Sequence, residues 1–176
     1  MLLKPEVLAA LNKQIAHEAS NEQIYRVLED FFSKYNLHGF EKLFASQAKG
    51  EYQHRQMLID YVHDKNGCVE YLPIKSFSLK EGGELPSRIS EIMNKFLMVE
   101  EETTKMLYGI YETSEKAADY GTCAWLNKPD GLILEQIEEE GLAQDMISRA
   151  ELACKCQSPN LGVLTWDIEL LERFNG

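Results

Sequence analysis

The sequence Glu51-Tyr52-Gln53-His54 carries the most structural information in this chain. Within it, a carboxylate and an imidazole stand three residues apart, so both project from one face if the segment is helical. Glu-x-x-His on a helix is one half of a carboxylate-bridged dimetal site. Carboxylates and imidazole around open coordination positions suit ferrous iron. The stretch therefore predicts a helical bundle that binds metal between its helices.

Two further acids lie at heights that match this stretch. In an antiparallel helix pair, residues equidistant from the turn lie level with each other. Glu18 and His54 have their midpoint at (18 + 54)/2 = 36, inside a break predicted over residues 36–39. Glu100 and Gln136 have theirs at (100 + 136)/2 = 118, inside a second predicted break. Buried carboxylates are costly unless a positive charge neutralises them, so a metal pair is the expected partner.

The pattern of apolar residues predicts an all-α chain. A connection as long as the irregular segment 68–86 implies that the chain crosses the whole bundle there. Lys128-Pro129-Asp130-Gly131 should kink the fourth helix or delay its start. The first predicted helix covers about residues 5–35, and the second covers 39–67 with Gly67 as its C-terminal cap. The third runs from Pro86 to the break near 118, and a helical stretch at 119–127 precedes the main part of the fourth at 132–154. After a loop at 158–160, an amphipathic helix covers 161–174.

Composition sets limits on the class of protein. A chain of 176 residues with 44% hydrophobic residues should form one globular domain, residues 1–176. The net charge of −11 argues against a nucleic-acid partner. No apolar run is long enough to cross a bilayer and the N-terminus is no signal peptide, so we expect a cytoplasmic protein with no membrane partner. The four cysteines form no Cys-x-x-Cys pair and are expected to be reduced.

Taken singly, each motif has an ordinary explanation. Glu51-x-x-His54 alone is more often a solvated pair, and Glu18 alone would be a surface acid. The runs at 100–102 and 138–140 would usually be exposed charge. Tyr25 lies about two turns after Glu18 on the same face, where a tyrosine is more often part of the core. The matched heights favour a site, because several independent coincidences would otherwise be needed.

Over nearly its whole length the chain resembles the non-haem bacterial-type ferritins, of the ferritin-like di-iron family. The residues that carry the resemblance are Leu3-Lys4-Pro5-Glu6, Leu11-Asn12-Lys13-Gln14, Glu51-x-x-His54 and Glu135-Gln136-x-Glu138-Glu139. The resemblance implies a four-helix bundle over residues 5–155 with a long second crossover and a short fifth helix at 161–174. It also implies a homo-oligomer, a hollow 24-subunit cage that stores ferric mineral.

The resemblance further implies a ferroxidase, which oxidises Fe(II) with O2 or H2O2 at an intrasubunit di-iron centre, and no haem. Glu18, Glu51 and His54 would bind the first iron, and Glu51, Glu100 and Gln136 the second. Tyr25 would lie beside them as part of the catalytic set. A third iron site would use the fourth-helix acids Glu135, Glu138 and Glu139.

The sequence departs from this family in three places. Gly50 stands where the third iron site usually takes a further glutamate, so that site lacks one ligand. Gln53 and Gln56 stand where many ferritins carry acids associated with mineral formation. Residues 128–131 resemble a small insertion in the fourth helix.

Two rival functions remain open on the sequence. Another dimetal carboxylate enzyme, such as a rubrerythrin-like peroxidase or an oxygenase, would commonly carry a second Glu-x-x-His. Three residues after Glu100 and Glu135 stand Thr103 and Glu138, so the second histidine is missing. A haem-binding bacterioferritin is disfavoured for the same reason. The other rival is a non-catalytic helical cage protein whose acids are merely solvated.

Overall fold

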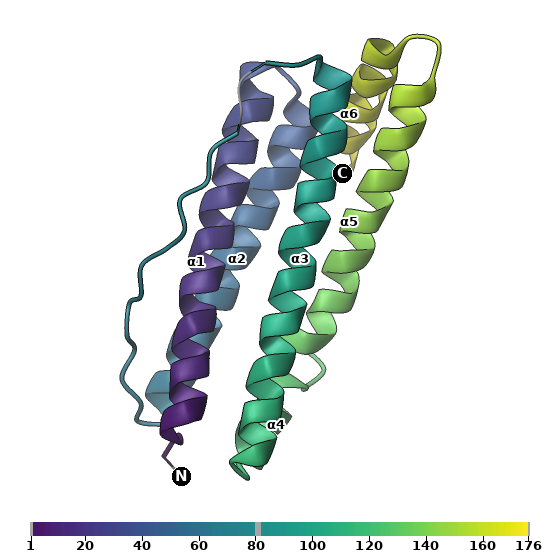
Figure 1. Cartoon of the computed structure of the whole chain (residues 1–176). Helices are drawn as coiled ribbons and strands as arrows, with labels where there is room; N and C mark the ends of the chain where they lie inside the picture. Colours follow the sequence, from purple (N-terminus) through teal and green to yellow (C-terminus); the bar gives the residue numbers. More distant parts are fainter. Residues whose placement is uncertain (1, 80–81, 176) are drawn as a thin grey trace.

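The computed structural model describes residues 2–79 and 82–175, and all regular structure in these ranges is helical. Four long helices, α1, α2, α3 and α5, run side by side as a bundle, and a short helix closes one end (Figure 1). This arrangement confirms the predicted fold class. The helices are α1 (Pro5–Lys34), α2 (His38–Asp64), α3 (Leu85–Lys116), α4 (Tyr120–Leu126), α5 (Leu132–Lys155) and α6 (Pro159–Asn175).

Both predicted turns are centred where the matched spacing placed them. Asn36 follows α1 with a φ of 55°, and Ala118 follows α3 with a φ of 54°. A left-handed residue at this position lets the next N–H groups satisfy the last carbonyls of the helix. In the first turn the N–H of Leu37 donates to the carbonyl of Phe32 at 3.0 Å. The first turn therefore brings residues equidistant from 36, such as Glu18 and His54, to the same height.

The ends of α2 differ slightly from the prediction. The helix begins at His38, one residue before Gly39. At its C-terminus the left-handed residue is Asn66, with a φ of 52°, and not Gly67 as predicted. Gly67 is required for space, because a Cβ there would lie 2.9 Å from Cγ1 of Val62.

The segment that connects α2 to α3 crosses the length of the bundle, as predicted, and lies along α1 (Figure 1). Two polar side chains of α1 hold its backbone. The N–H of Glu70 donates to Oδ1 of Asn12 at 3.1 Å, and the N–H of Lys75 donates to Oγ of Ser20 at 3.1 Å. The crossover therefore makes α3 parallel to α2, which a short hairpin turn could not do (Figure 1).

The predicted break in the fourth helix is confirmed as a late start. α4 ends at Leu126, and α5 begins at Leu132 after an irregular segment that contains Pro129. The backbone at Gly131 is too crowded for a side chain, since a Cβ there would lie 2.6 Å from the carbonyl oxygen of Leu126. This glycine therefore lets the chain fold back tightly before α5.

The last helix starts earlier than predicted and carries apolar side chains on two sides. Pro159 lies in its first turn, where a missing N–H costs nothing, and not in a loop. Val163, Trp166 and Leu170 are buried. Leu164 and Ile168, by contrast, are 47% and 49% exposed. α6 therefore carries a second, outward apolar stripe.

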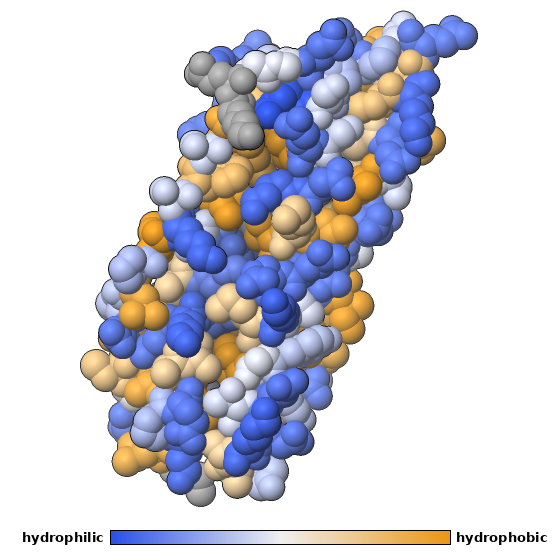
Figure 2. All heavy atoms as spheres, viewed as in Figure 1, coloured by the Kyte–Doolittle hydropathy of each residue, from blue (hydrophilic) through white to orange (hydrophobic). Residues whose placement is uncertain are grey.

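Two hydrophobic clusters fill the bundle, one at each end. The first contains stacked aromatic rings such as Phe32 and Phe44, whose centroids are 5.4 Å apart, and includes the buried side of α6. The second surrounds Leu11 and Leu58. Hydrophilic side chains cover most of the face seen in Figure 2, and hydrophobic ones gather in its upper half. Among the described residues, no helix is long and apolar enough to cross a membrane.

Candidate metal centre

Three of the predicted ligands converge between the two hydrophobic clusters. One ligand atom from each of Glu18, Glu51 and His54 lies within 4.8 Å of the other two. These residues are only 1%, 4% and 6% exposed. Nδ1 of His54 lies 3.5 Å from Oε2 of Glu51. No other group of three such residues comes this close within residues 2–79 and 82–175.

The second half of the bundle adds a further acid and an amide. Glu100 in α3 is 1% exposed, and the hydroxyl of Tyr25 in α1 donates to its Oε1. Gln136 in α5 is buried, and its Oε1 accepts a hydrogen bond from Oγ1 of Thr104 at 3.1 Å. The negative charge of Glu100 acts on Glu51 strongly enough to help raise the pKa of that carboxyl. Helices α1, α2, α3 and α5 thus all contribute polar side chains at this depth.

The three remaining predicted acids of α5 are not gathered into one group. Oε1 of Glu135 lies 3.2 Å from Nε2 of His54. Glu139 is partly buried, and its Oε2 is enclosed without a hydrogen-bond partner. Glu138 is exposed and lines a small hollow at the helix break, beside Asp130. Only Glu135 and Glu139 therefore face the cluster.

Burial dominates the electrostatics of the carboxyl groups. It raises the pKa of Glu51 and, with the charge of Glu51, raises the pKa of Glu18 well above its usual range. Burial also raises the pKa of Glu100 to about 8, although the bond from Tyr25 opposes this shift. The cluster without a cation therefore holds protons that carboxylates normally release.

The pKa of His54 is raised although the side chain is buried. Burial alone would lower its pKa, but the contacts with Glu135 and Glu51 and the negative charges of Glu51 and Glu18 raise it to about 11. In turn, the bond to His54 lowers the pKa of Glu135. A cation that bound here would replace the positive charge of the imidazolium and release its proton.

Unpartnered oxygens test whether these residues fit a metal. Buried polar atoms are nearly always hydrogen-bonded, and exceptions call for an explanation. Oxygen atoms are enclosed without any hydrogen-bond partner on four neighbouring side chains. All four are oxygen atoms, so a bound cation would supply the contact that each of them lacks. The four atoms are Oε1 of Gln14 and Oε2 of Glu18, Glu51 and Glu139.

Sequence reasoning missed several side chains that hold the cluster in place. Nε2 of Gln14 donates to Oε1 of Glu18 at 2.7 Å from one turn earlier in α1. The i, i+4 spacing of a glutamine and a glutamate was the available signal. Oγ1 of Thr103 accepts from Nδ2 of Asn21 at 3.0 Å and lies 2.9 Å from Nε2 of His17. No local spacing predicts this second group, because it joins α1 to α3.

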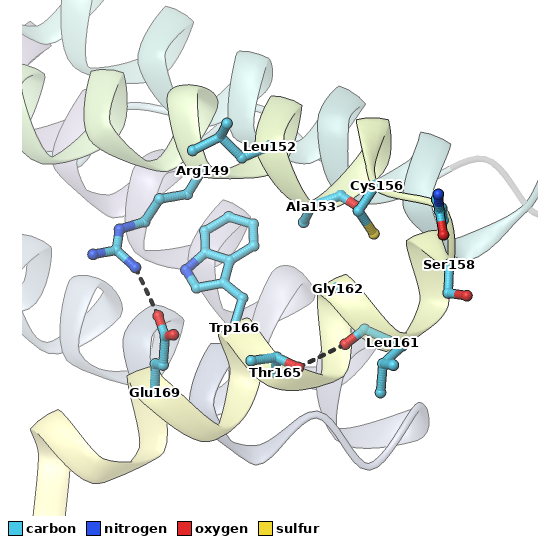
Figure 3. A pocket seen from close by; sticks show the side chains of 11 residues that line it. Arg149, Leu152, Ala153, Cys156, Ser158, Leu161, Gly162, Thr165, Trp166 and Glu169 are labelled. Atoms are coloured by element: carbon cyan, nitrogen blue, oxygen red, sulfur yellow. Dashed lines mark hydrogen bonds and ion pairs between the residues drawn. The ribbon is translucent and has the colours of Figure 1, made fainter.

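The cluster has an opening to the surface. His54 and Glu135 line a hollow of about 390 Å³ together with Tyr52, Gln53 and Asp60, among others. A separate hollow of about 570 Å³ lies between α5 and α6, where Trp166 lies beside the Arg149–Glu169 ion pair (Figure 3). That hollow contains none of the cluster residues. The hollow beside His54 therefore adjoins the cluster.

Comparison with known proteins agrees with this geometry. The family model described as "Ferritin-like domain" matches residues 8–153. A "Bacterial non-heme ferritin" from Staphylococcus aureus (strain USA300) is 29% identical over 147 residues, which is 84% of each chain. The crystal structure of a ferritin from the green alga Ulva pertusa superposes with a TM-score of 0.86 at 26% identity, covering 96% of this chain and 85% of the other. An open-pore ferritin from Archaeoglobus fulgidus has a TM-score of 0.83 at 23% identity, covering 96% and 97%, and supports the fold alone.

Proposed function

The chain belongs to the family of ferritin-like domains, and we therefore propose that it is an iron-storage ferritin with ferroxidase activity. The single observation that supports this most is the buried group Glu18, Glu51 and His54, whose ligand atoms already lie within 4.8 Å of one another. Hard anionic oxygens with one imidazole are ligands that iron accepts. Without a cation, so many buried acids would be costly.

In this proposal Glu18, Glu51 and His54 bind the first ferrous ion. Glu51 also reaches the second, which Glu100 and Gln136 complete. Tyr25 holds Glu100 in position through its hydroxyl. Glu139 is the α5 acid that we assign to additional bound iron, because its buried Oε2 has no partner. Glu138 is exposed and would act only at the surface near the helix break.

The proposed reaction removes one electron from each of two ferrous ions. Dioxygen that takes both electrons and two protons becomes hydrogen peroxide, and hydrogen peroxide that takes two electrons and two protons becomes water. The anionic ligand set favours ferric over ferrous iron and so drives the oxidation. Ferric product then leaves the pair of sites for storage as mineral.

Storage requires an assembly, and we propose that the chain forms a closed homo-oligomeric cage of 24 subunits. The outward stripe of α6 supports this, because Leu161, Leu164 and Ile168 are exposed at i, i+3 and i+7. An apolar stripe of this kind commonly marks a protein interface. Size-exclusion chromatography tests the assembly, since a species near one or two chains of 20.2 kDa contradicts it.

The activity is tested by adding ferrous iron in air and following the ferric absorbance. The double variant Glu51→Ala/His54→Ala should lose the fast phase of oxidation. His38 and Glu41 provide a matched control, because they are also a histidine and a glutamate three residues apart on α2, but exposed. His38→Ala/Glu41→Ala should oxidise iron at the wild-type rate. An unchanged rate in the first variant rules out the assigned site.

A further inference from the structure

The imidazole of His54 is held from both sides. Nδ1 faces Oε2 of Glu51 at 3.5 Å, within the group of converging ligand atoms. Nε2 faces Oε1 of Glu135 at 3.2 Å, on the opposite edge of the ring. A histidine that binds a metal through one nitrogen usually donates the other N–H to a carboxylate or carbonyl, which fixes the tautomer and the ring orientation.

We propose that Glu135 is the positioning residue of His54. Its carboxylate accepts the Nε2–H and so leaves Nδ1 turned toward Glu18 and Glu51 for the cation. The inference deepens the proposed function and rests on its ligand set. It also changes the expected role of Glu135, from a ligand of a third iron to a partner of the first iron's histidine.

The ring geometry keeps Glu135 apart from the first ion. The two nitrogens of an imidazole point away from each other, so a group bonded to Nε2 lies on the far side of the ring from an ion on Nδ1. While Glu135 holds Nε2 of His54, its Oε1 cannot also bind an ion between Glu18 and Glu51. Gly50 adds no ligand on this side, since it has no side chain.

The break in the fourth helix explains how Glu135 reaches this place. α5 begins at Leu132, so Glu135 lies in its first turn, and its N–H donates to the carbonyl of Gly131 at 3.2 Å. The positive end of the helix dipole favours a carboxylate in that turn. Gly131 sets the start of the helix, because the crowding at its backbone excludes any side chain.

Replacing Glu135 should have little effect on folding. Its side chain is 43% exposed, whereas that of His54 is 7% exposed. Both line the opening of about 390 Å³. Glu138 lies one turn further along α5 and is exposed, so it provides a control with the same change of charge.

The first measurement uses metal-free protein. Magic-angle-spinning NMR of sedimented protein labelled with ¹⁵N-histidine reports the hydrogen bond of each imidazole nitrogen, and His54→Gln assigns the signal. Glu135→Ala should shift the Nε2 signal of His54, whereas Glu138→Ala should leave it in place. An unshifted signal in Glu135→Ala overturns the proposal, whether or not the protein oxidises iron.

The second measurement is anaerobic titration with Co²⁺, followed by its visible spectrum. Glu135→Ala should weaken the first Co²⁺ by roughly 10–100-fold without changing the number bound per chain. Glu135→Gln should weaken it less, because the amide oxygen still accepts from Nε2–H. If Glu135→Ala instead loses one bound ion and keeps the first affinity, Glu135 is a ligand and the inference is wrong. If His54→Gln leaves the first Co²⁺ affinity unchanged, the proposed ligand set fails, and the NMR result alone then decides whether Glu135 positions the ring.

Discussion

The carboxylate of Asp167 in α6 accepts a hydrogen bond from the backbone N–H of Phe40 at 2.9 Å, although the two residues are 127 positions apart. Phe40 lies in the first turn of α2, whose own N-cap residue, Leu37, provides no side-chain hydrogen bond. The first N–H groups of a helix need acceptors. The last helix of the chain therefore supplies the cap that α2 lacks.

Asp167→Ala should lower the stability by about 1 kcal/mol or more, because it leaves the first turn of α2 without its acceptor. For a chain of this size that is a fall of roughly 2–4 °C in melting temperature. Glu169→Ala, which removes an exposed ion pair with Arg149, should change the melting temperature little. Equal effects of the two variants would show that Asp167 is not a cap.

Gly39→Ala should be destabilising, because α6 passes directly over Gly39. A Cβ at this position would overlap the carbonyl oxygen of Asp167 and would lie 2.9 Å from Cβ of Leu170. Overpacking of this kind costs about 1–3 kcal/mol. Gly50→Ala is the matched control on the same helix, since a Cβ there meets nothing within 4 Å. It should instead stabilise the helix by about 1 kcal/mol, so the two melting temperatures should move in opposite directions.

Tyr25→Phe should lower the melting temperature of metal-free protein while keeping the packing of the ring. The change removes the hydroxyl that donates to buried Glu100. A buried acceptor that loses its donor costs about 1–3 kcal/mol. Tyr52→Phe removes a hydroxyl from a tyrosine that is 49% exposed and should have almost no effect. A melting temperature unaltered by Tyr25→Phe would mean that the bond contributes nothing.

Metal-free protein should become less stable as the pH rises. The pKa of Glu100 is raised from 4.5 to about 8 in the folded chain, and that of His54 from 6.5 to about 11. At intermediate pH the folded state holds protons that the unfolded chain has released. The stability from Glu100 is complete below pH 4.5 and is lost as the pH rises through 8, and that from His54 is complete below 6.5 and is lost toward 11.

Melting curves recorded in a chelator between pH 5 and 8 test whether the stability falls as the pH rises. Each extra proton held by the folded state contributes a slope of about 1.4 kcal/mol per pH unit. Glu100→Gln should reduce the slope, because it removes one of the groups that titrate. Glu101→Gln makes the same change of charge at an exposed neighbour and should leave the slope unchanged. A melting temperature that rises across this range would contradict the burial of protonated acids.

Leu164→Glu/Ile168→Glu should break the assembly without unfolding the chain. Both side chains are about half exposed on α6, so new charges there are tolerated by a free subunit but not at an apolar contact. Size-exclusion chromatography should show smaller species, with unchanged helical content by circular dichroism. Asn160→Glu places a charge at another exposed position of α6 and should leave the assembly intact.

The sequence allowed prediction of the bundle and the level of its polar side chains, because both follow from local patterns. Helix periodicity located the four long helices, and the midpoints 36 and 118 identified the two residues with positive φ that centre the turns, Asn36 and Ala118. Glu18, Glu51 and His54 were correctly expected to converge, since equal distance from a turn fixes equal height.

The remaining features depend on contacts between distant segments, which no local pattern encodes. Gly39 was predicted only as the start of α2, but it is also the point where α6 passes closest, next to the cap that Asp167 gives to α2. The side of α6 that faces the core is set by how α6 lies against α2 and α5, and it leaves Leu164 and Ile168 outside. The contact of Glu135 with His54 likewise depends on where α5 restarts after the break.

The crossover also divides the molecule into two helical parts, α1 with α2 before it and α3 to α6 after it. Glu18, Glu51 and His54 precede it, and Glu100 and Gln136 follow it. A single proteolytic nick within residues 71–78 would leave two helical fragments, each with part of the ligand set. Neither fragment alone could bind a pair of ions, but mixing the two should restore the bundle and the site together. Recovery of cobalt colour on mixing would then report directly on the docking of one half against the other.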